Sequence, residues 1–179
     1  MPSLDRSFED EVKAITTQVT WVIDTSSVAE VRRSIENAKK PGVFLSMEIL
    51  VNESRLVFPK QLVDELERWA DPGSPDAQYA WAKKNEAKAT QYTPTLDQIK
   101  EVLSVVPRVL DPDKDTGVEE ADPFVLAIAV HLRLEGKDAR IITEEKNDTP
   151  RKLSLRTAAG LMGVPSVPLK AFLQFENII

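Results

Sequence analysis

Short buried strands alternate with helical stretches along this chain, and the alternation limits the folds open to it. TWVID (residues 20–24) and ARIIT (139–143) are short runs of bulky and β-branched residues, typical of buried strands. RLVF (55–58) and VPSV (164–167) are shorter strand candidates. Because strands separated by helices form parallel sheets covered on both faces, the sequence predicts an α/β fold. We expect a three-layer α/β/α sandwich with a central parallel sheet.

Helical spacing or a helix-starting proline marks the segments between these strands. Pro41 and Gly42 are expected to end the helix that follows the first strand. Leu62, Leu66 and Trp69 fall on one face of another helix, so we expect Trp69 to pack between helices rather than to stack on nucleic-acid bases. Helices are expected at about residues 27–40, 43–54, 59–70, 75–90, 95–106, 123–136, 153–162 and 168–175.

Length and charge place limits on the organisation of the chain. Its 179 residues suit one domain, which we expect at 20–179, preceded by a helical or flexible extension at 1–19. A net charge of −6 argues against a broad surface for nucleic acid but allows a local basic patch. No apolar run approaches the roughly 20 residues of a membrane helix, and the acidic N-terminus does not resemble a signal peptide. We therefore expect a cytoplasmic protein without a membrane partner.

The supply of reactive side chains narrows the chemistry. The absence of cysteine excludes disulfides and thiolate zinc sites. His131 is the only histidine, so a Ser-His-Asp triad would have to use it, and a multi-histidine metal site is excluded. Any bound metal ion would need carboxylate and other oxygen ligands, which suit Mg²⁺, Mn²⁺ or Ca²⁺.

Acidic residues recur where a parallel sheet places its ligands, beyond the carboxyl ends of the strands. Asp24 follows the first strand, Glu144 and Glu145 follow ARIIT, Asp122 precedes the strongest helix, and Glu65 lies in the helix 59–70. Each position also has an ordinary structural interpretation: a turn or cap at Asp24, a helix cap at Asp122, a charged turn at Glu144 and Glu145, and a solvated charge at Glu65. Convergence of several carboxylates would require a cation or a proton between them.

A second, local metal site would lie in the acidic loop before that helix. Asp111, Asp113, Asp115 and Asp122 have the spacing of positions 1, 3, 5 and 12 of a calcium-binding EF-hand loop. However, Thr116 stands where such a loop needs glycine for its sharp turn. We expect a solvated acidic loop there.

Four motifs in order resemble the PIN domain family, the fold of the VapC-like toxin nucleases and related ribonucleases. They are WVIDTSS, FPKQLVDEL, EEADPFVLAIA and IITEE, and LSLRTAAGLMGVPSVPLKAFL is similar to the C-terminal part of that family. The resemblance implies an endoribonuclease that hydrolyses RNA phosphodiester bonds with Mg²⁺ or Mn²⁺. It also implies the toxin of a type II toxin–antitoxin pair, with an antitoxin partner and a possible homodimer.

The resemblance assigns roles to individual residues. Asp24, Glu65, Asp122 and Glu145 would be the catalytic, metal-binding acids, although Glu144 competes with Glu145 for the fourth place. Thr25, Ser26, Thr143 and Glu144 would support them. Phosphate contacts are expected from Lys39, Lys40, Arg151, Lys152 and Arg156. The alternatives are a binding or regulatory module with a degenerate PIN-like site and, less compatible with the DTSS sequence, a phosphatase using Asp24 as nucleophile.

Overall fold

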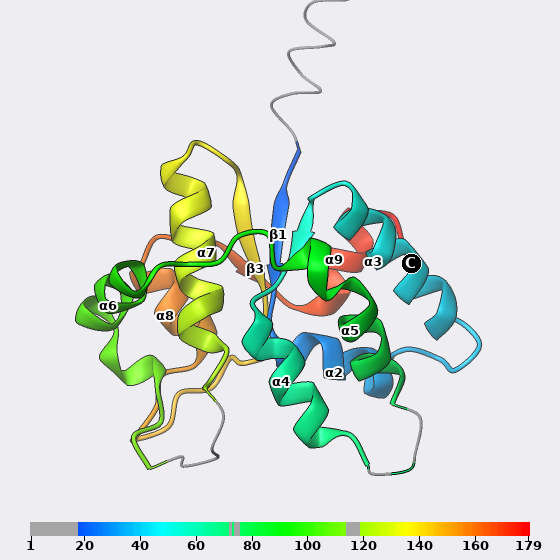
Figure 1. Ribbon diagram of the computed structural model, residues 1–179, viewed down its shortest axis with the longest axis horizontal. Helices are drawn as coiled ribbons and strands as arrows, with labels where there is room; N and C mark the ends of the chain where they lie inside the picture. The colour runs from blue at the N-terminus through cyan, green and yellow to red at the C-terminus, as the bar shows by residue number, and fades with distance from the viewer. Residues whose placement is uncertain (1–17, 72, 74–75, 114–118) are drawn as a thin grey trace, which may run out of the picture.

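A central parallel sheet organises the molecule in the computed structural model, which describes residues 18–71, 73, 76–113 and 119–179 (Figure 1). Its strands are β1 (Thr20–Ile23), β2 (Leu56–Val57), β3 (Ala139–Ile142) and β4 (Ser166–Val167). They lie in the order β2-β1-β3-β4, and every neighbouring pair is parallel. All four predicted strands are confirmed. The expected extension at 1–19 falls almost wholly outside the described residues.

Helices cover both faces of the sheet. They are α2 (Thr25–Ser34), α3 (Lys40–Asn52), α4 (Lys60–Trp69), α5 (Ala77–Ala89), α6 (Leu96–Val105), the short 3₁₀ helix η1 (Pro107–Val109), α7 (Asp122–Leu134), α8 (Leu155–Leu161) and α9 (Leu169–Phe175). Figure 1 shows α6, α7 and α8 on one side of β1 and β3, and α2, α3, α4, α5 and α9 on the other. None of the helices built from described residues is long and apolar enough to cross a membrane.

Alternation along the strands divides the core into two parts. Trp21 and Ile23 of β1 belong to the cluster beneath α2–α5 and α9, whereas Val22 between them belongs to the cluster beneath α6–α8. Successive side chains of a strand point to opposite faces, so β1 and β3 are buried on both sides. The predicted three-layer α/β/α fold is therefore confirmed.

The strand order fixes where a ligand would bind. The chain passes from β1 to β2 at one edge and then returns across β1 to β3 on its other side. The connection that leaves β1 and the connection that leaves β3 therefore run toward opposite edges of the sheet. Open parallel sheets bind ligands at such a point, beyond the carboxyl ends of the two strands. Asp24 and Thr143 are the first residues beyond these two strands.

Three local predictions are wrong. Pro41 does not end a helix: α2 stops at Ser34, and Pro41 lies in the first turn of α3, where its missing N–H costs nothing. Trp69 is 58% exposed, although Leu62 and Leu66 on the same face are buried as expected. Asp122 does not cap α7 with its side chain, because Ala121 is the N-cap and Asp122 is the first helical residue.

Candidate functional site

Asp24 lies at the junction of β1 and α2, almost fully buried with 1% of its surface exposed. Its extended backbone makes it the N-cap of α2, and its Oδ1 accepts a hydrogen bond of 2.8 Å from the Ser27 amide. The expected cap is therefore present. The same carboxylate also accepts hydrogen bonds from Ser26 and from the neighbouring strand, so capping is only part of its environment.

Two hydroxyl groups hold the Asp24 carboxylate in place. Ser26 Oγ lies 2.9 Å from Oδ1 and 2.8 Å from Oδ2, and Thr143 Oγ1 donates to Oδ2 at 2.6 Å. Thr143 Oγ1 in turn accepts from the Glu145 amide at 3.0 Å, so it joins the ends of β1 and β3. Burial raises the pKa of Asp24 to about 6, against the lowering effect of these hydrogen bonds. The expected supporting roles of Ser26 and Thr143 agree with this geometry.

Replacing Thr143 with valine is expected to raise the pKa of Asp24 above about 6, because the variant loses a hydrogen bond that favours the ionised carboxylate. The loss should also lower the unfolding free energy by about 1 kcal/mol. Carboxyl ¹³C shifts followed by NMR across a pH titration measure the pKa. Thr143→Ser keeps the hydroxyl and should retain the parent pKa. An unchanged pKa in the valine variant would contradict this account.

The Glu65 side chain in α4 accepts hydrogen bonds from the first turn of α2 and from the start of α7. Its Oε2 accepts a short hydrogen bond from Thr25 Oγ1 in α2, and its Oε1 accepts from the Ala121 amide at the start of α7, at 3.1 Å. Glu65 is therefore not a solvated helix charge. Thr25, expected to orient the acids, fixes Glu65 rather than Asp24.

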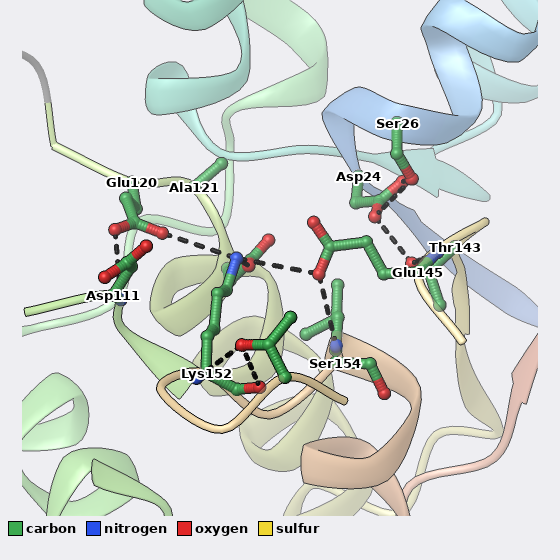
Figure 2. Close-up of polar contacts among 12 residues, drawn as sticks. Asp24, Ser26, Asp111, Glu120, Ala121, Thr143, Glu145, Lys152 and Ser154 are labelled. Atoms are coloured by element: carbon green, nitrogen blue, oxygen red, sulfur yellow. Dashed lines mark hydrogen bonds and ion pairs between the residues drawn. The ribbon is translucent and has the colours of Figure 1, made fainter. Parts of the chain in front are cut away.

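Lys152 lies among three carboxylates beside Asp24 (Figure 2). Its Nζ is 2.5 Å from Asp122 Oδ2, 3.4 Å from Glu120 Oε2 and 3.6 Å from Glu145 Oε2. Burial opposes the charge of Lys152, but these acids more than offset it and raise the pKa of its ammonium. The residue expected to contact phosphate instead supplies the positive charge at the centre of the site.

The position of Asp122 perturbs its titration. Asp122 is 8% exposed, and its burial, together with the Glu145 charge, raises its pKa to about 8 despite the nearby Lys152 ammonium. The Asp24 charge contributes in the same direction. Asp24, Glu65, Glu120, Asp122 and Glu145 are hereafter called the acidic cluster.

The structure separates the two candidates for the fourth acid. Glu145 Oε2 faces Lys152 and accepts from the Leu155 amide at 3.3 Å. Glu144 Oε1 instead accepts from the Leu169 amide at the start of α9, at 2.6 Å, while its own amide donates to Ser26 Oγ at 3.1 Å. Glu145 therefore points into the acidic cluster. Glu144 does not, and its hydrogen bonds instead hold the start of α9 and the Ser26 side chain in place.

Sequence reasoning missed Glu120 and misplaced Lys152. Glu120 is 8% exposed, and its Oε1 accepts from the Asp111 amide at 3.2 Å. Its place two residues before Asp122 was the one available signal. The other expected phosphate contacts lie on the surface: Lys39 pairs with Glu36, Lys40 with Asn37 and Arg151 with Asp113, while Arg156 is exposed on α8.

The EF-hand alternative gains little from the structure. Asp111 Oδ1 accepts from the Asp113 amide at 3.1 Å, which is a local turn. Asp115 and Thr116 lie outside the described residues. Asp122, the last position of that spacing, bonds to Lys152 instead.

The acidic cluster has the donor chemistry of a site for a hard cation, since all its ligands are oxygens. Within residues 18–71, 73, 76–113 and 119–179, however, no group of three or more acid or histidine side chains is arranged to hold a metal ion. The ammonium of Lys152 takes the central place. A solvent-facing hollow of about 300 Å³ opens beside it, lined by Glu144, Glu145, Lys146, Asn147, Thr149, Lys152, Leu153 and Ser154.

Of three comparisons with known proteins, one identifies the family of this chain. The search of curated proteins gave no match, and the search of solved structures gave none. A family model described as "Domain of unknown function (DUF4411)" matches residues 21–178, which include the whole acidic cluster and all four strands except Thr20, the first residue of β1. The chain therefore belongs to the DUF4411 family.

Proposed function

We propose that the protein is a PIN-like endoribonuclease that hydrolyses RNA phosphodiester bonds with Mg²⁺ or Mn²⁺. The observation that carries the proposal is the gathering of mutually repelling acidic side chains at the carboxyl ends of β1 and β3. Asp122, Glu120 and Glu145 lie around the Lys152 ammonium, and the charges of Asp24 and Glu145 reach Asp122 as well. Repulsion between buried acids lowers the stability of the fold. Clusters of such repelling acids are typical of sites that bind a cation or perform chemistry.

The residues have separable roles in this proposal. Asp24, Asp122, Glu145 and Glu65 would hold the metal ion, which would lower the pKa of a bound water and stabilise charge on the attacked phosphate. Thr143 and Ser26 fix Asp24, and Thr25 fixes Glu65. Lys152, once displaced from Asp122 by the stronger charge of a divalent ion, would have its ammonium free to bind a phosphate oxygen.

Partners and cellular role rest on the PIN resemblance. The parallel sheet with helices on both faces is compatible with a PIN-like fold. By that resemblance the protein would be the cytoplasmic toxin of a type II toxin–antitoxin pair, inhibited by a cognate antitoxin, and the same resemblance allows a homodimer. Its substrate would be RNA.

Asp24→Asn is expected to abolish metal-dependent RNA cleavage while the protein stays folded, because asparagine keeps the helix cap but removes a charged ligand. A labelled single-stranded RNA incubated with Mg²⁺, Mn²⁺ or a chelator measures cleavage, and circular dichroism checks the fold. Asp97→Asn, in an exposed acid of α6, is the matched control. Equal cleavage by Asp24→Asn and the parent would exclude this site assignment.

A binding or regulatory module with a degenerate site is the second candidate, and the position of Lys152 favours it. An ammonium fixed among the acids can replace a metal ion structurally without supplying its chemistry. Manganese titration separates the two candidates. The nuclease should bind Mn²⁺ saturably, and Asp122→Ala should remove that binding. A degenerate module should bind no Mn²⁺ at all.

A further inference from the structure

The exposed Trp69 lies in a groove with basic side chains. Trp69 is 58% exposed at the end of α4, and Arg32 and Arg33 are exposed at the end of α2. A hollow of about 440 Å³ is lined by Ala29, Arg32, Arg33, Leu66, Trp69, Asp76 and Gln78. A second hollow of about 230 Å³ shares Arg32, Trp69, Asp76 and Gln78 and adds Lys40, Phe44, Asp71 and Ala77 to the lining. The two hollows form one groove, hereafter the Trp69 groove.

The Trp69 groove continues from the acidic cluster along two packed helices. The Thr25–Glu65 hydrogen bond joins α2 to α4 at the cluster. Ala29 lies four residues after Thr25 in α2, and Trp69 lies four residues after Glu65 in α4, so these two groove-lining residues follow one turn further on the same side of each helix. At about 1.5 Å per residue, Arg32 lies about 10 Å along α2 from Thr25, and Trp69 lies about 6 Å along α4 from Glu65. A strand bound at the cluster would therefore reach the groove with its adjacent nucleotides.

The charge of the groove differs from that of the whole protein. Three cations, Arg32, Arg33 and Lys40, line it together with two carboxylates, Asp71 and Asp76, in a chain of net charge −6. Asp76 is already engaged, since its side chain accepts from the Tyr79 amide at 2.9 Å. Arg33 pairs with Glu30 at 3.6 Å, but Arg33 is 70% exposed, and such surface pairs contribute little. The guanidinium groups are therefore available to an anionic ligand.

An accessible indole beside guanidinium groups suits single-stranded nucleic acid. Each base can stack on an aromatic face, and guanidinium groups bind phosphate oxygens through paired hydrogen bonds. A base inside a duplex has its faces covered by its neighbours, so stacking on Trp69 requires an unpaired strand. Trp21 and Trp81 are buried, with 1% and 5% exposed, and are not accessible for this contact.

We propose that Trp69, Arg32 and Arg33 form a subsite for single-stranded RNA, in which a base flanking the cleaved bond stacks on the indole and its phosphate binds the two arginines. The subsite rests on the proposed ribonuclease function for its place beside the cleaved bond. It makes single-stranded RNA the substrate class of the acidic cluster.

Binding of a fluorescent single-stranded oligoribonucleotide, measured by anisotropy in the presence of a chelator, tests the subsite without cleavage. Trp69→Ala is expected to weaken binding about tenfold, within the range for loss of one stacked base, while Trp69→Phe retains most of the affinity. Arg32→Ala combined with Arg33→Ala should weaken binding and reduce the slope of log K against log salt by about 0.7 for each phosphate group that is no longer bound. Leu96→Ala and Lys100→Ala, in exposed residues of α6, are the controls.

The outcomes separate the subsite from the proposed function. Parent-like binding by Trp69→Ala overturns the subsite, even if Asp24→Asn has lost cleavage. Weakened binding by Trp69→Ala supports the subsite as an RNA contact, even if no metal ion supports cleavage, in which case only the nuclease assignment fails. A parent that does not bind RNA in the presence of the chelator overturns the subsite, and the metal-dependent cleavage assay then decides the nuclease assignment by itself. If Trp69→Ala changes only self-association in analytical ultracentrifugation, the groove is a protein interface and the subsite is wrong.

Discussion

Lys152→Met is expected to lower the free energy of unfolding by about 3 kcal/mol above about pH 8, where Asp122 is ionised, the cost of removing one partner from a buried ion pair. The Lys152 ammonium neutralises Asp122 at 2.5 Å, with Glu120 and Glu145 at 3.4 and 3.6 Å. Methionine keeps most of the apolar stem and removes the charge. Asp122 and Glu145 would then face each other without the Lys152 ammonium, and their repulsion would oppose folding.

Urea unfolding at fixed pH measures this loss, with an unchanged m-value showing that the unfolded state is unaltered. Lys146→Met is the matched control, because Lys146 is exposed in the same loop and should change stability little. If the acidic cluster binds Mg²⁺ or Mn²⁺, the metal ion should restore the stability of Lys152→Met. Above the dissociation constant, each tenfold increase in free metal ion would add about 1.4 kcal/mol. Equal stability of Lys152→Met and Lys146→Met would contradict the central role of Lys152.

The fold and part of the site could be predicted because they depend on local patterns. TWVI and ARII are short and rich in bulky apolar residues, as strands buried on both faces are, and this places Asp24 and Thr143 directly after the ends of β1 and β3. In a parallel sheet those ends share one edge, so the Thr143–Asp24 hydrogen bond follows from the topology. Residues tied to strand ends were therefore predictable from the sequence.

Interactions made by loops and helix ends were not predictable in the same way. Lys152 meets Asp122 across 30 residues of chain, and no periodicity links the two positions. Pro41 has two meanings in a sequence, because proline both ends one helix and is tolerated at the start of the next. Trp69 has the spacing of a core residue, but Leu66 is 3% exposed and Trp69 58%. The last turn of α4 thus extends past the edge of the core, so Trp69 is exposed even though its spacing predicts burial.

The stability of the parent protein is expected to fall as the pH rises from about 4 to about 8, because Asp24 and Asp122 have raised pKa values in the folded state. Between the ordinary aspartate pKa of 3.8 and folded pKa values of about 6 and about 8, the folded protein binds more protons than the unfolded chain. Raising the pH through this window therefore favours unfolding. At about 1.36 kcal/mol per pKa unit, Asp24 alone accounts for about 3 kcal/mol.

Other groups with shifted pKa values titrate outside this window. Lys152 has a raised pKa, so its contribution is complete below the ordinary lysine pKa of 10.5 and constant from pH 4 to 8. Asp138 and Asp148 have lowered pKa values, so their contributions are lost only as the pH falls below about 4. The slope in the window therefore reports on the acidic cluster.

Asp122→Asn should remove the Asp122 share of that slope. Asparagine has the shape of the protonated acid, and Lys152 keeps Glu120 and Glu145 as partners. The variant should become increasingly more stable than the parent as the pH rises from about 4 to about 8. It should also lose metal-dependent RNA cleavage. Urea unfolding at a series of pH values measures the first effect, and Asp97→Asn, in a 95% exposed side chain, is the control.

A divalent ion turns the same measurement into a test of binding. A cation among the carboxylates favours their ionised forms, so Mg²⁺ should flatten or reverse the fall in parent stability with pH and have little effect on Asp122→Asn. A parent whose stability is flat or rises through the window without metal would contradict the buried, repelling acids. A slope that is present but indifferent to Mg²⁺ and Mn²⁺ would instead favour the degenerate module, because the cluster would then bind neither divalent ion.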